Sequence, residues 1–418
     1  MGSTRKWGRL GMPFLVAALV LTACSGSSGG SGATPTTLNV VLPAGRPDTT
    51  TFIKQHIPEF KSATGIDVNV IETPYDQLNT KLVTEFRGGG KTFDVVGMPH
   101  EWTPTYANYL LSIDDRLTQA DKDDFLKAAL ASTTYKGHTY GLMYVITTMI
   151  LFYRTDLLQA KGLGVPTTWS DYLSTAQALT SPPVFGTMVT AKNNPEPVGM
   201  FLNYLYQAGG AIDDDKGNVV INSDAGVKAL QFMVDQVLRY KVAPPAASTY
   251  TTADTTTFFT EGNLAMAPNW IYMAALADGK DSKVAGKFGM AVLPCGSKCA
   301  STIGGWNLSI AKSSSNKDAA YKFIHFMTDT QRESRMAIDY GNPPTRNSSA
   351  KDPDVAKLAF LPVVLKALEN GVPRNAPAWP QVETALAVAL SGAASGAMSP
   401  KQALDQAASA IKDAQQQQ

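Results

Sequence analysis

The three cysteines are the residues whose positions most directly suggest chemistry. A thiol can carry a covalent modification, form a disulfide or bind a metal ion, and its surroundings decide which. Cys24 stands alone directly after Leu21-Thr22-Ala23, whereas Cys295 and Cys299 are separated by three residues. The segment around Cys24 indicates whether the chain is exported. Export in turn decides whether Cys295 and Cys299 can form a disulfide, because disulfides persist in compartments outside the reducing cytosol.

Cys24 ends a segment with the pattern of an export signal. An apolar run at 10–21 follows three basic residues, Arg5, Lys6 and Arg9, and the small Ala23 precedes the cysteine. This run is shorter than the roughly 20 apolar residues that span a bilayer. Leu21-Thr22-Ala23-Cys24 resembles the bacterial lipobox, in which the Cys thiol receives a diacylglyceryl group. We expect Cys24 to be a lipid anchor; the alternative is a plain secretory signal with an incidental cysteine.

Cys295 and Cys299 are the remaining pair in a chain that we expect to be exported. We therefore expect them to form a disulfide. Because the loop is short, the bond should contribute less than the ~2–4 kcal/mol that is typical of disulfides. Metal binding by this Cys-x3-Cys is the alternative, but no His or second cysteine pair lies nearby in sequence to complete a tetrahedral site.

The sequence offers no credible set of catalytic residues. Four histidines are scattered through it, at positions 56, 100, 138 and 325. No His-Glu-x-x-His, Walker loop or Gly-x-Gly-x-x-Gly is present. A Gly-x-Ser-x-Gly match at 26–30 falls in a Ser/Gly tract, where no strand-to-helix turn could strain the serine. We expect no enzyme activity, no cofactor and no metal site, although two carboxylates could meet in space as in a glycosidase.

Composition favours a folded, nearly neutral protein. The 418 residues carry 36 basic and 35 acidic side chains, a formal net charge of +1, and no basic run follows the signal. The sequence therefore shows no basic patch of the kind that binds nucleic acid. The length is too great for one compact core and suits two domains. A neutral or small polar ligand fits this charge best.

Strands and helices alternate in the hydrophobic pattern. Residues 38–42 and 66–70 are predicted strands with a helix at 52–60 between them, and a further strand is predicted at 93–96. Such alternation implies open sheets flanked by helices. Thr168 to Asp171 resembles a helix capping box, Ser223 is a predicted helix N-cap, and the apolar residues of 320–327 mark a third helix. Residues 213–218 have the composition of a turn but lack the residue spacing of an EF-hand calcium-binding loop.

Five segments from Tyr135 onward follow one another along the chain: Tyr135-Lys136-Gly137-His138-Thr139-Tyr140-Gly141, Leu151-Phe152-Tyr153-Arg154-Thr155-Asp156, Pro166-Thr167-Thr168-Trp169, Phe259-Thr260-Glu261-Gly262-Asn263-Leu264-Ala265-Met266, and Gly304-Gly305-Trp306-Asn307-Leu308-Ser309-Ile310. In this colinear order the chain resembles the extracellular solute-binding proteins of ATP-driven carbohydrate importers, which include maltose- and multiple-sugar-binding proteins. Arg154 stands where Asn is usual and Met143 where Pro is common. Both departures border the first predicted crossover, where they could alter the ligand.

The resemblance implies an α/β, two-lobed fold of the periplasmic-binding-protein type, each lobe an open sheet flanked by helices, with three hinge crossovers and ligand between the lobes. The implied segments are a lipoprotein signal peptide at 1–24, a Ser/Gly tether at 25–37, lobe one at 38–143 plus 302–339, and lobe two at 147–296 plus 343–418. The crossovers fall near 143–147, 296–302 and 339–343. The cysteine pair then lies beside the second crossover, and we hypothesise that its bond stiffens that hinge.

A sugar presents apolar C–H faces and a ring of hydroxyls, so its site needs aromatic surfaces and paired donors and acceptors. Trp270 occupies a position that resembles the family's cleft tryptophan. Trp306 follows two glycines, which would let a ligand approach the backbone. Trp379, from the C-terminal loop, and Asn307, directly after Trp306, are further candidates. A core position is the alternative for each tryptophan.

Polar candidates complete the predicted site. Glu101 and Trp102 stand where family members place an acid and an aromatic on the sugar, with solvated surface as the alternative for Glu101. Two further candidate ligand-binding residues are Arg46, in the first β-α loop, and Glu196, in a Pro-rich loop. Asp94 also ends a predicted strand, but in this motif the Asp more often holds the following loop in place.

The sequence therefore predicts a lipid-anchored, monomeric receptor on the extracytoplasmic face of the membrane. It would bind a mono- or oligosaccharide and deliver it to the permease subunits of an importer. The alternatives are the same scaffold with a glycerol phosphate ester or polyamine as ligand, or a secreted glycosidase.

Overall fold

The computed structural model describes residues 36–45 and 47–417. The predicted signal, most of the tether, the anchor residue Cys24 and the candidate Arg46 lie outside the described residues. From Thr36 onward the chain forms one compact unit. Within the described part of the chain, no helix has both the length and the apolar character needed to cross a membrane.

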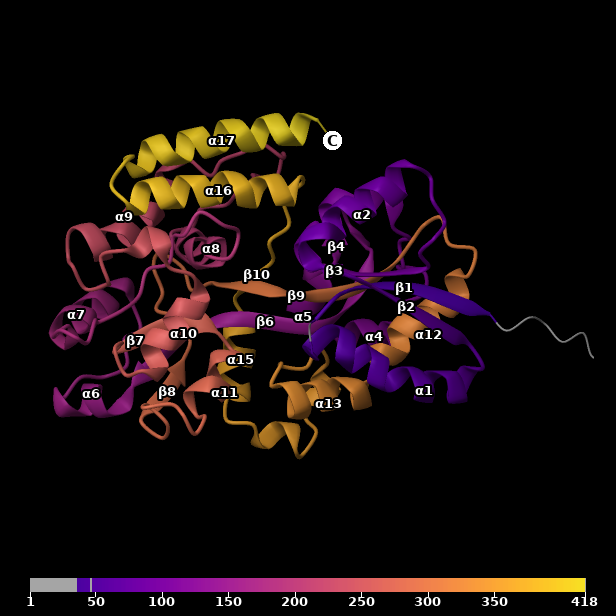
Figure 1. The fold of residues 1–418 in the computed structure, drawn as a ribbon, viewed down its shortest axis with the longest axis horizontal. Coiled ribbons are helices and arrows are strands. Elements are labelled where there is room, and N and C mark those ends of the chain that lie inside the picture. Colours follow the sequence, from indigo (N-terminus) through magenta and orange to yellow (C-terminus); the bar gives the residue numbers. More distant parts are fainter. Residues whose placement is uncertain (1–35, 46, 418) are drawn as a thin grey trace, which may run out of the picture. The chain divides into compact units, whose positions relative to one another are not determined.

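The predicted β-α-β unit opens the fold (Figure 1). Strand β1 (Thr37–Pro43) pairs in parallel with β2 (Asp67–Thr73), and α1 (Phe52–Thr64) connects them. Gly65 ends α1 with φ 70, a left-handed conformation that costs glycine little because it lacks a Cβ. A π-helical turn at Pro47–Thr51 precedes the helix.

The third predicted strand is displaced along the chain. β3 covers Val95–Pro99 and also pairs in parallel with β1, so Asp94 precedes the strand and does not end it. Its carboxylate accepts hydrogen bonds from the Asn39 amide at 2.9 Å and the Ser314 hydroxyl at 2.5 Å. Asp94 thus fastens β1 to a distant loop, whereas its motif suggests a role in holding the loop that follows it.

Two long strands carry the sheet through the molecule. β6 (Gly141–Arg154) and β9 (Ser301–Ile310) are antiparallel partners, and β9 also pairs with β3. The other end of β6 pairs with β7 (Met266–Trp270) and β8 (Phe288–Ala291). Among the described residues, eight strands therefore form one mixed sheet with the path β2-β1-β3-β9-β6-β7, to which β8 and β10 (Gly371–Val372) attach. The register shifts between Met143 and Val145.

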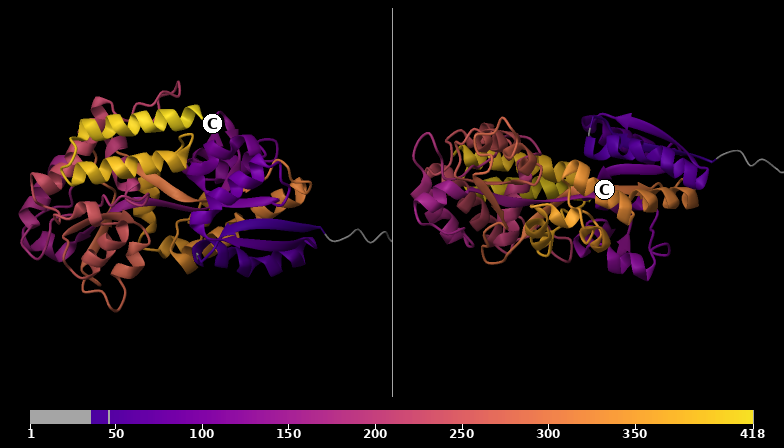
Figure 2. Two further views of the ribbon diagram at one scale, coloured as in Figure 1. Left: turned by 45° about the horizontal axis from the view of Figure 1, so that its top comes forward. Right: turned by 90° about the horizontal axis from the view of Figure 1, so that it is seen from below.

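Helices cover the sheet in two groups, one around β1–β3 and one around β7 and β8 (Figure 1). Figure 2 shows the same division, with α16 and α17 side by side in the second group. The remaining helices and strands have these bounds: α2 Tyr75–Arg87, α3 Thr103–Tyr106, α4 Gln119–Asp124, α5 Lys127–Ser132, β4 Thr134–Tyr135, β5 His138–Thr139, α6 Thr155–Ala160, α7 Trp169–Leu179, α8 Val198–Gln207, α9 Asp224–Leu238, α10 Thr252–Thr260, α11 Met273–Ala277, α12 Lys317–Met327, α13 Thr330–Tyr340, α14 Asn347–Ala350, α15 Leu361–Leu368, α16 Trp379–Ala394 and α17 Pro400–Gln416.

Three predicted helices are confirmed with their local chemistry. α7 begins with a capping box in which the Thr168 hydroxyl accepts from the Asp171 amide and the Asp171 carboxylate accepts from the Thr168 amide. Ser223 caps α9 through the Gly226 amide. α12 buries the apolar stripe expected at 320–327. Residues 213–218 form the expected turn, closed by Asp214.

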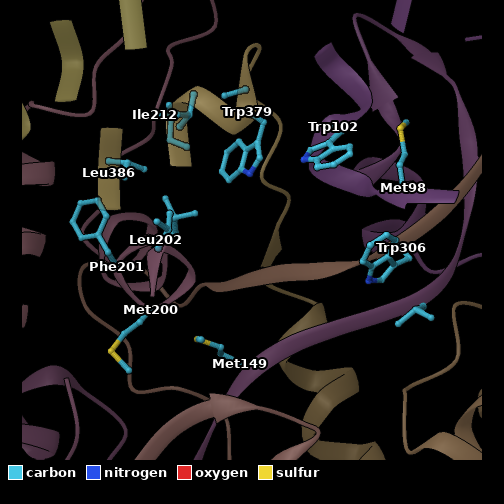
Figure 3. Packing of buried hydrophobic residues seen from close by; sticks show 14 of the residues in the cluster. Met98, Trp102, Met149, Met200, Phe201, Leu202, Ile212, Trp306, Trp379 and Leu386 are labelled. Atoms are coloured by element: carbon cyan, nitrogen blue, oxygen red, sulfur yellow. The ribbon is translucent and has the colours of Figure 1, made fainter. Parts of the chain in front are cut away.

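The apolar core is continuous from one group of helices to the other. Figure 3 shows Met98, Trp102 and Trp306 on one side and Met149, Leu202 and Trp379 on the other. Trp379 is fully buried and Trp102 nearly so. Both sequence candidates are therefore core residues at the place where the two groups meet.

Candidate functional site

A cavity of about 620 Å³ lies along β6 and β9 between the two groups of elements. This volume falls within the roughly 300–1,000 Å³ of small-molecule sites. Its walls come from segments far apart in the sequence: Asp48, Tyr75, Pro99, Glu101, Val145, Thr147, Asn194, Pro195, Glu196, Thr252, Trp270, Tyr272, Gly304, Gly305, Trp306, Asn342, Arg374 and Glu383. Four sequence candidates, Trp270, Trp306, Glu101 and Glu196, thus line one space.

Two glycines form the floor of the cavity for a packing reason. A Cβ on Gly304 would lie 3.0 Å from ring carbon Cζ3 of Trp270, and a Cβ on Gly305 would lie 2.0 Å from the Val145 carbonyl oxygen. Gly305 also has φ 139, which L side chains rarely adopt. The glycines therefore let Trp270 and β6 approach β9 closely.

Aromatic rings form opposing walls. Trp306 is nearly buried and packs edge-on against Tyr75, with ring centroids 5.8 Å apart. Tyr75 also stacks on Trp102, with ring centroids 6.0 Å apart. Trp270 is half-buried, and Tyr272, two residues later, is 44% exposed. Exposed ring faces of this kind suit the apolar faces of an organic ligand.

A buried ion-pair cluster closes one end of the cavity. Nη2 of Arg374 lies 2.9 Å from Oε1 of Glu101, and Nη1 lies 3.6 Å from Oε1 of Glu383. The Arg374 Nε donates to the Ile303 carbonyl at 3.1 Å. The guanidinium also lies 5.9 Å from the Trp270 ring and 5.7 Å from the Trp379 ring. The cluster joins the turn after β3 to the segment around β10 and α16.

Burial sets the protonation of this cluster. It raises the pKa of Glu383 to about 7, helped by the Glu101 charge and opposed by Arg374. Burial also lowers the pKa of His100, which is fully buried and whose Nε2 lies 3.1 Å from the Ile303 carbonyl oxygen. His100 is therefore neutral at physiological pH. Its Nε2 lies 3.4 Å from Oε2 of Glu101, an oxygen without a hydrogen-bond partner among the described residues.

The opposite rim is polar and more open. The exposed Glu196 carboxylate accepts a hydrogen bond from the Thr252 hydroxyl at the start of α10. Thr252 also accepts from the Asn269 side chain through its carbonyl, at 3.2 Å, and Asn269 precedes Trp270 in β7. The Glu196 rim and the Trp270 ring are thus held by one local network.

Three sequence candidates do not line the cavity. Trp102 is buried against Tyr75 and Tyr106. Trp379 is the first residue of α16 and is fully buried. Asn307 follows Trp306 in β9, so its side chain leaves the opposite face of the strand, where it donates to the Ser309 hydroxyl at 2.7 Å. Strand alternation at Trp306 could have excluded Asn307 from the sequence alone.

Other lining residues were missed by the sequence analysis. Tyr272 could have been found, because it follows Trp270 by two residues. Nothing local marks Tyr75, Arg374 or Glu383, since tertiary packing alone brings them together. The described residues hold no group of three or more His, Cys, Asp or Glu arranged to bind a metal ion.

The cysteine pair is bonded in the structure and lies outside the cavity. Cys295 and Cys299 have Cα atoms 4.4 Å apart. The Cys295 amide donates to the Thr167 carbonyl at 2.8 Å, and its carbonyl accepts from the Trp169 amide at 2.9 Å. The Lys298 amide donates to the Gln207 carbonyl at 2.9 Å. The loop is thus fastened to the start of α7 and the end of α8, just before β9.

Comparison with known proteins gives concordant matches. A family model described as bacterial extracellular solute-binding protein matches residues 55–362. A probable ABC transporter-binding protein of Deinococcus radiodurans is 28% identical over 326 residues, which are 75% of this chain and 77% of that protein.

Two solved structures have similar folds. Maltose-bound MalE3 of T. maritima is 28% identical with a TM-score of 0.78, covering 90% of this chain and 99% of that one. An ABC transporter solute-binding protein from Agrobacterium radiobacter, in complex with ribitol, is 31% identical with a TM-score of 0.76, covering 92% and 100%. Each similarity covers nine-tenths or more of this chain.

Proposed function

Because this chain belongs to the bacterial extracellular solute-binding proteins, we propose that it binds a mono- or oligosaccharide in the cavity and delivers it to the membrane subunits of an ATP-driven importer. The family binds solutes and does not catalyse reactions, so the glycosidase alternative is dropped. The two-lobed α/β fold predicted from the sequence agrees with the similar structures.

The observation that carries the proposal is the pairing of aromatic and charged side chains in one cavity. Trp270, Tyr272 and Tyr75 offer faces for C–H groups, while Glu101 and Glu196 offer carboxylate acceptors for hydroxyls. Hydrogen bonds to an ionised acceptor are stronger than neutral ones. The maltose and ribitol in the two similar structures are polyhydroxylated solutes, which supports the same class here.

We further propose the lobe boundaries and anchor given by the sequence. Lobe one would hold residues 38–143 plus 302–339 and lobe two 147–296 plus 343–418, with lipid on Cys24 holding the monomer at the extracytoplasmic face. A phosphate ester is a weaker candidate ligand than a sugar, because Arg374 is already paired with two carboxylates.

Thermal shift of the mature protein against maltose, arabino-, galacto- and xylo-oligosaccharides, ribitol and mannitol tests the proposal. A ligand that binds the native state alone raises the melting temperature, by an amount that grows with its concentration. We expect at least one carbohydrate to do so and calorimetry to confirm one site. A shift with spermidine or glycerol 3-phosphate but with none of the carbohydrates would overturn it.

A further inference from the structure

The cavity has an unbalanced set of charges. Apart from Asp48, the described lining holds the carboxylates of Glu101, Glu196 and Glu383, and Arg374 is the one cationic side chain among the described lining residues. His100, which contacts Glu101, is neutral because burial lowers its pKa. The described lining therefore carries more negative than positive charge.

Arg374 does not offer a free guanidinium to an anionic ligand. Its three nitrogens are engaged by Glu101, Glu383 and the Ile303 carbonyl, and its side chain is 11% exposed. An anion that approached it would also meet the two carboxylates that already pair with it. Binding a negative ligand here would require breaking a buried ion pair, which is costly.

Glu196 is in the opposite situation. Its carboxylate is exposed to the cavity rim, accepts one hydrogen bond from Thr252, and forms no ion pair with a described residue. The rings of Trp270 and Tyr272 line the same space, and a cation near an aromatic face is attracted by it. A second acceptor, Oε2 of the nearly buried Glu101, has no hydrogen-bond partner among the described residues.

We infer that the site is built for a polyhydroxylated cation, an amino sugar or amino alditol, whose ammonium group binds at Glu196 while its carbon skeleton packs on Trp270 and Tyr272. The inference rests on the proposed carbohydrate function and names the charge of its ligand. A neutral sugar would fill the same space with weaker contacts at the rim, and an anionic sugar would be rejected.

Two matched series separate charge from shape. The first is D-glucitol, 1-amino-1-deoxy-D-glucitol and D-gluconate, and the second is maltitol, 1-amino-1-deoxymaltitol and maltobionate. Each series keeps one skeleton and changes its charge from zero to +1 and −1. Titration calorimetry of the mature protein at pH 7.5 and low salt should give, in at least one series, about tenfold tighter binding of the amine than of the neutral member, and no binding of the acid. High salt should reduce the difference in affinity between the amine and the neutral member.

The Glu196→Gln variant locates the cation. Its loss of affinity should be several-fold larger for the amine than for the neutral member of the same series. Glu369→Gln, an exposed residue outside the cavity that pairs with Lys366, serves as the control and should leave the ratio unchanged.

The outcomes are distinct. Equal or tighter binding of the neutral or acidic member overturns the inference and leaves the carbohydrate function standing. An unchanged amine-to-neutral ratio in Glu196→Gln also overturns it. Putrescine binding as tightly as the amino alditols, with no binding of the neutral members, overturns the carbohydrate function itself.

Discussion

At the residue scale, Trp270 and Trp306 show why residue type alone did not define the site. Both are sequence candidates that line the cavity, but Trp306 is 6% exposed and packs against Tyr75, whereas Trp270 is half-buried against Gly304. Removal of the Trp270 ring should therefore cost less stability than removal of the Trp306 ring. Arg374 and Glu383 could not be identified from the sequence, because Arg374 pairs both with Glu383 and with Glu101, which is far away in the chain.

The two tryptophans should separate affinity from stability. Trp270→Ala should weaken carbohydrate binding by about 1–3 kcal/mol, by analogy with the stacking of flat rings on aromatics, with a small change in melting temperature. Trp306→Ala should also lower the free energy of unfolding, by about 3–5 kcal/mol. Calorimetry and urea unfolding measure the two effects. Trp169→Ala, in the core beside α8, is the control and should cost stability alone; loss of stability without loss of affinity in Trp270→Ala would make that residue a core residue.

At the element scale, the sequence predicted those features that depend on local chemistry. The β-α-β unit, the capping box of α7 and the Ser223 cap depend on periodicity and on side chains within one turn, so they could be identified from the chain itself. The displacement of the third strand to Val95–Pro99 could not, because its pairing with β9 at Val95 to Pro99 decides where it begins and ends. The continuous course of β6 and β9 likewise depends on long-range partners.

The disulfide loop tests how an element next to a crossover affects ligand exchange. The loop is fastened to α7 and α8 by three backbone hydrogen bonds and leads directly into β9. The double variant Cys295→Ser, Cys299→Ser should lose less than the ~2–4 kcal/mol typical of disulfides, because the loop is short. If the bond stiffens the hinge, ligand association or dissociation rates in stopped flow should change. Reductant should reproduce the change in the parent protein and do nothing to the variant; equal rates with the bond verifiably absent would reject the hinge role.

At the scale of the whole molecule, the two groups of elements are joined by the sheet and by the ion-pair cluster. β6 and β9 supply continuous backbone, whereas Glu101 and Arg374 meet as side chains from segments that the sequence mapping assigns to different lobes. Hinge bending of two lobes is a common way to trap a solute in a cleft. The Glu101–Arg374 contact would then be made on closure and broken on opening, next to the ligand.

Solution scattering can test this coupling directly. We expect saturating ligand to lower the radius of gyration of the parent protein, since closure brings the lobes together. Arg374→Gln leaves two buried carboxylates without their partner, so the closed arrangement is disfavoured and the ligand-free variant should be the more extended. Arg335→Gln removes an exposed pair with Asp339 on α13 and should behave as the parent. If calorimetry detects binding while scattering from parent and Arg374→Gln stays identical with and without ligand, the lobes do not close on the solute, and Arg374 acts within a rigid site.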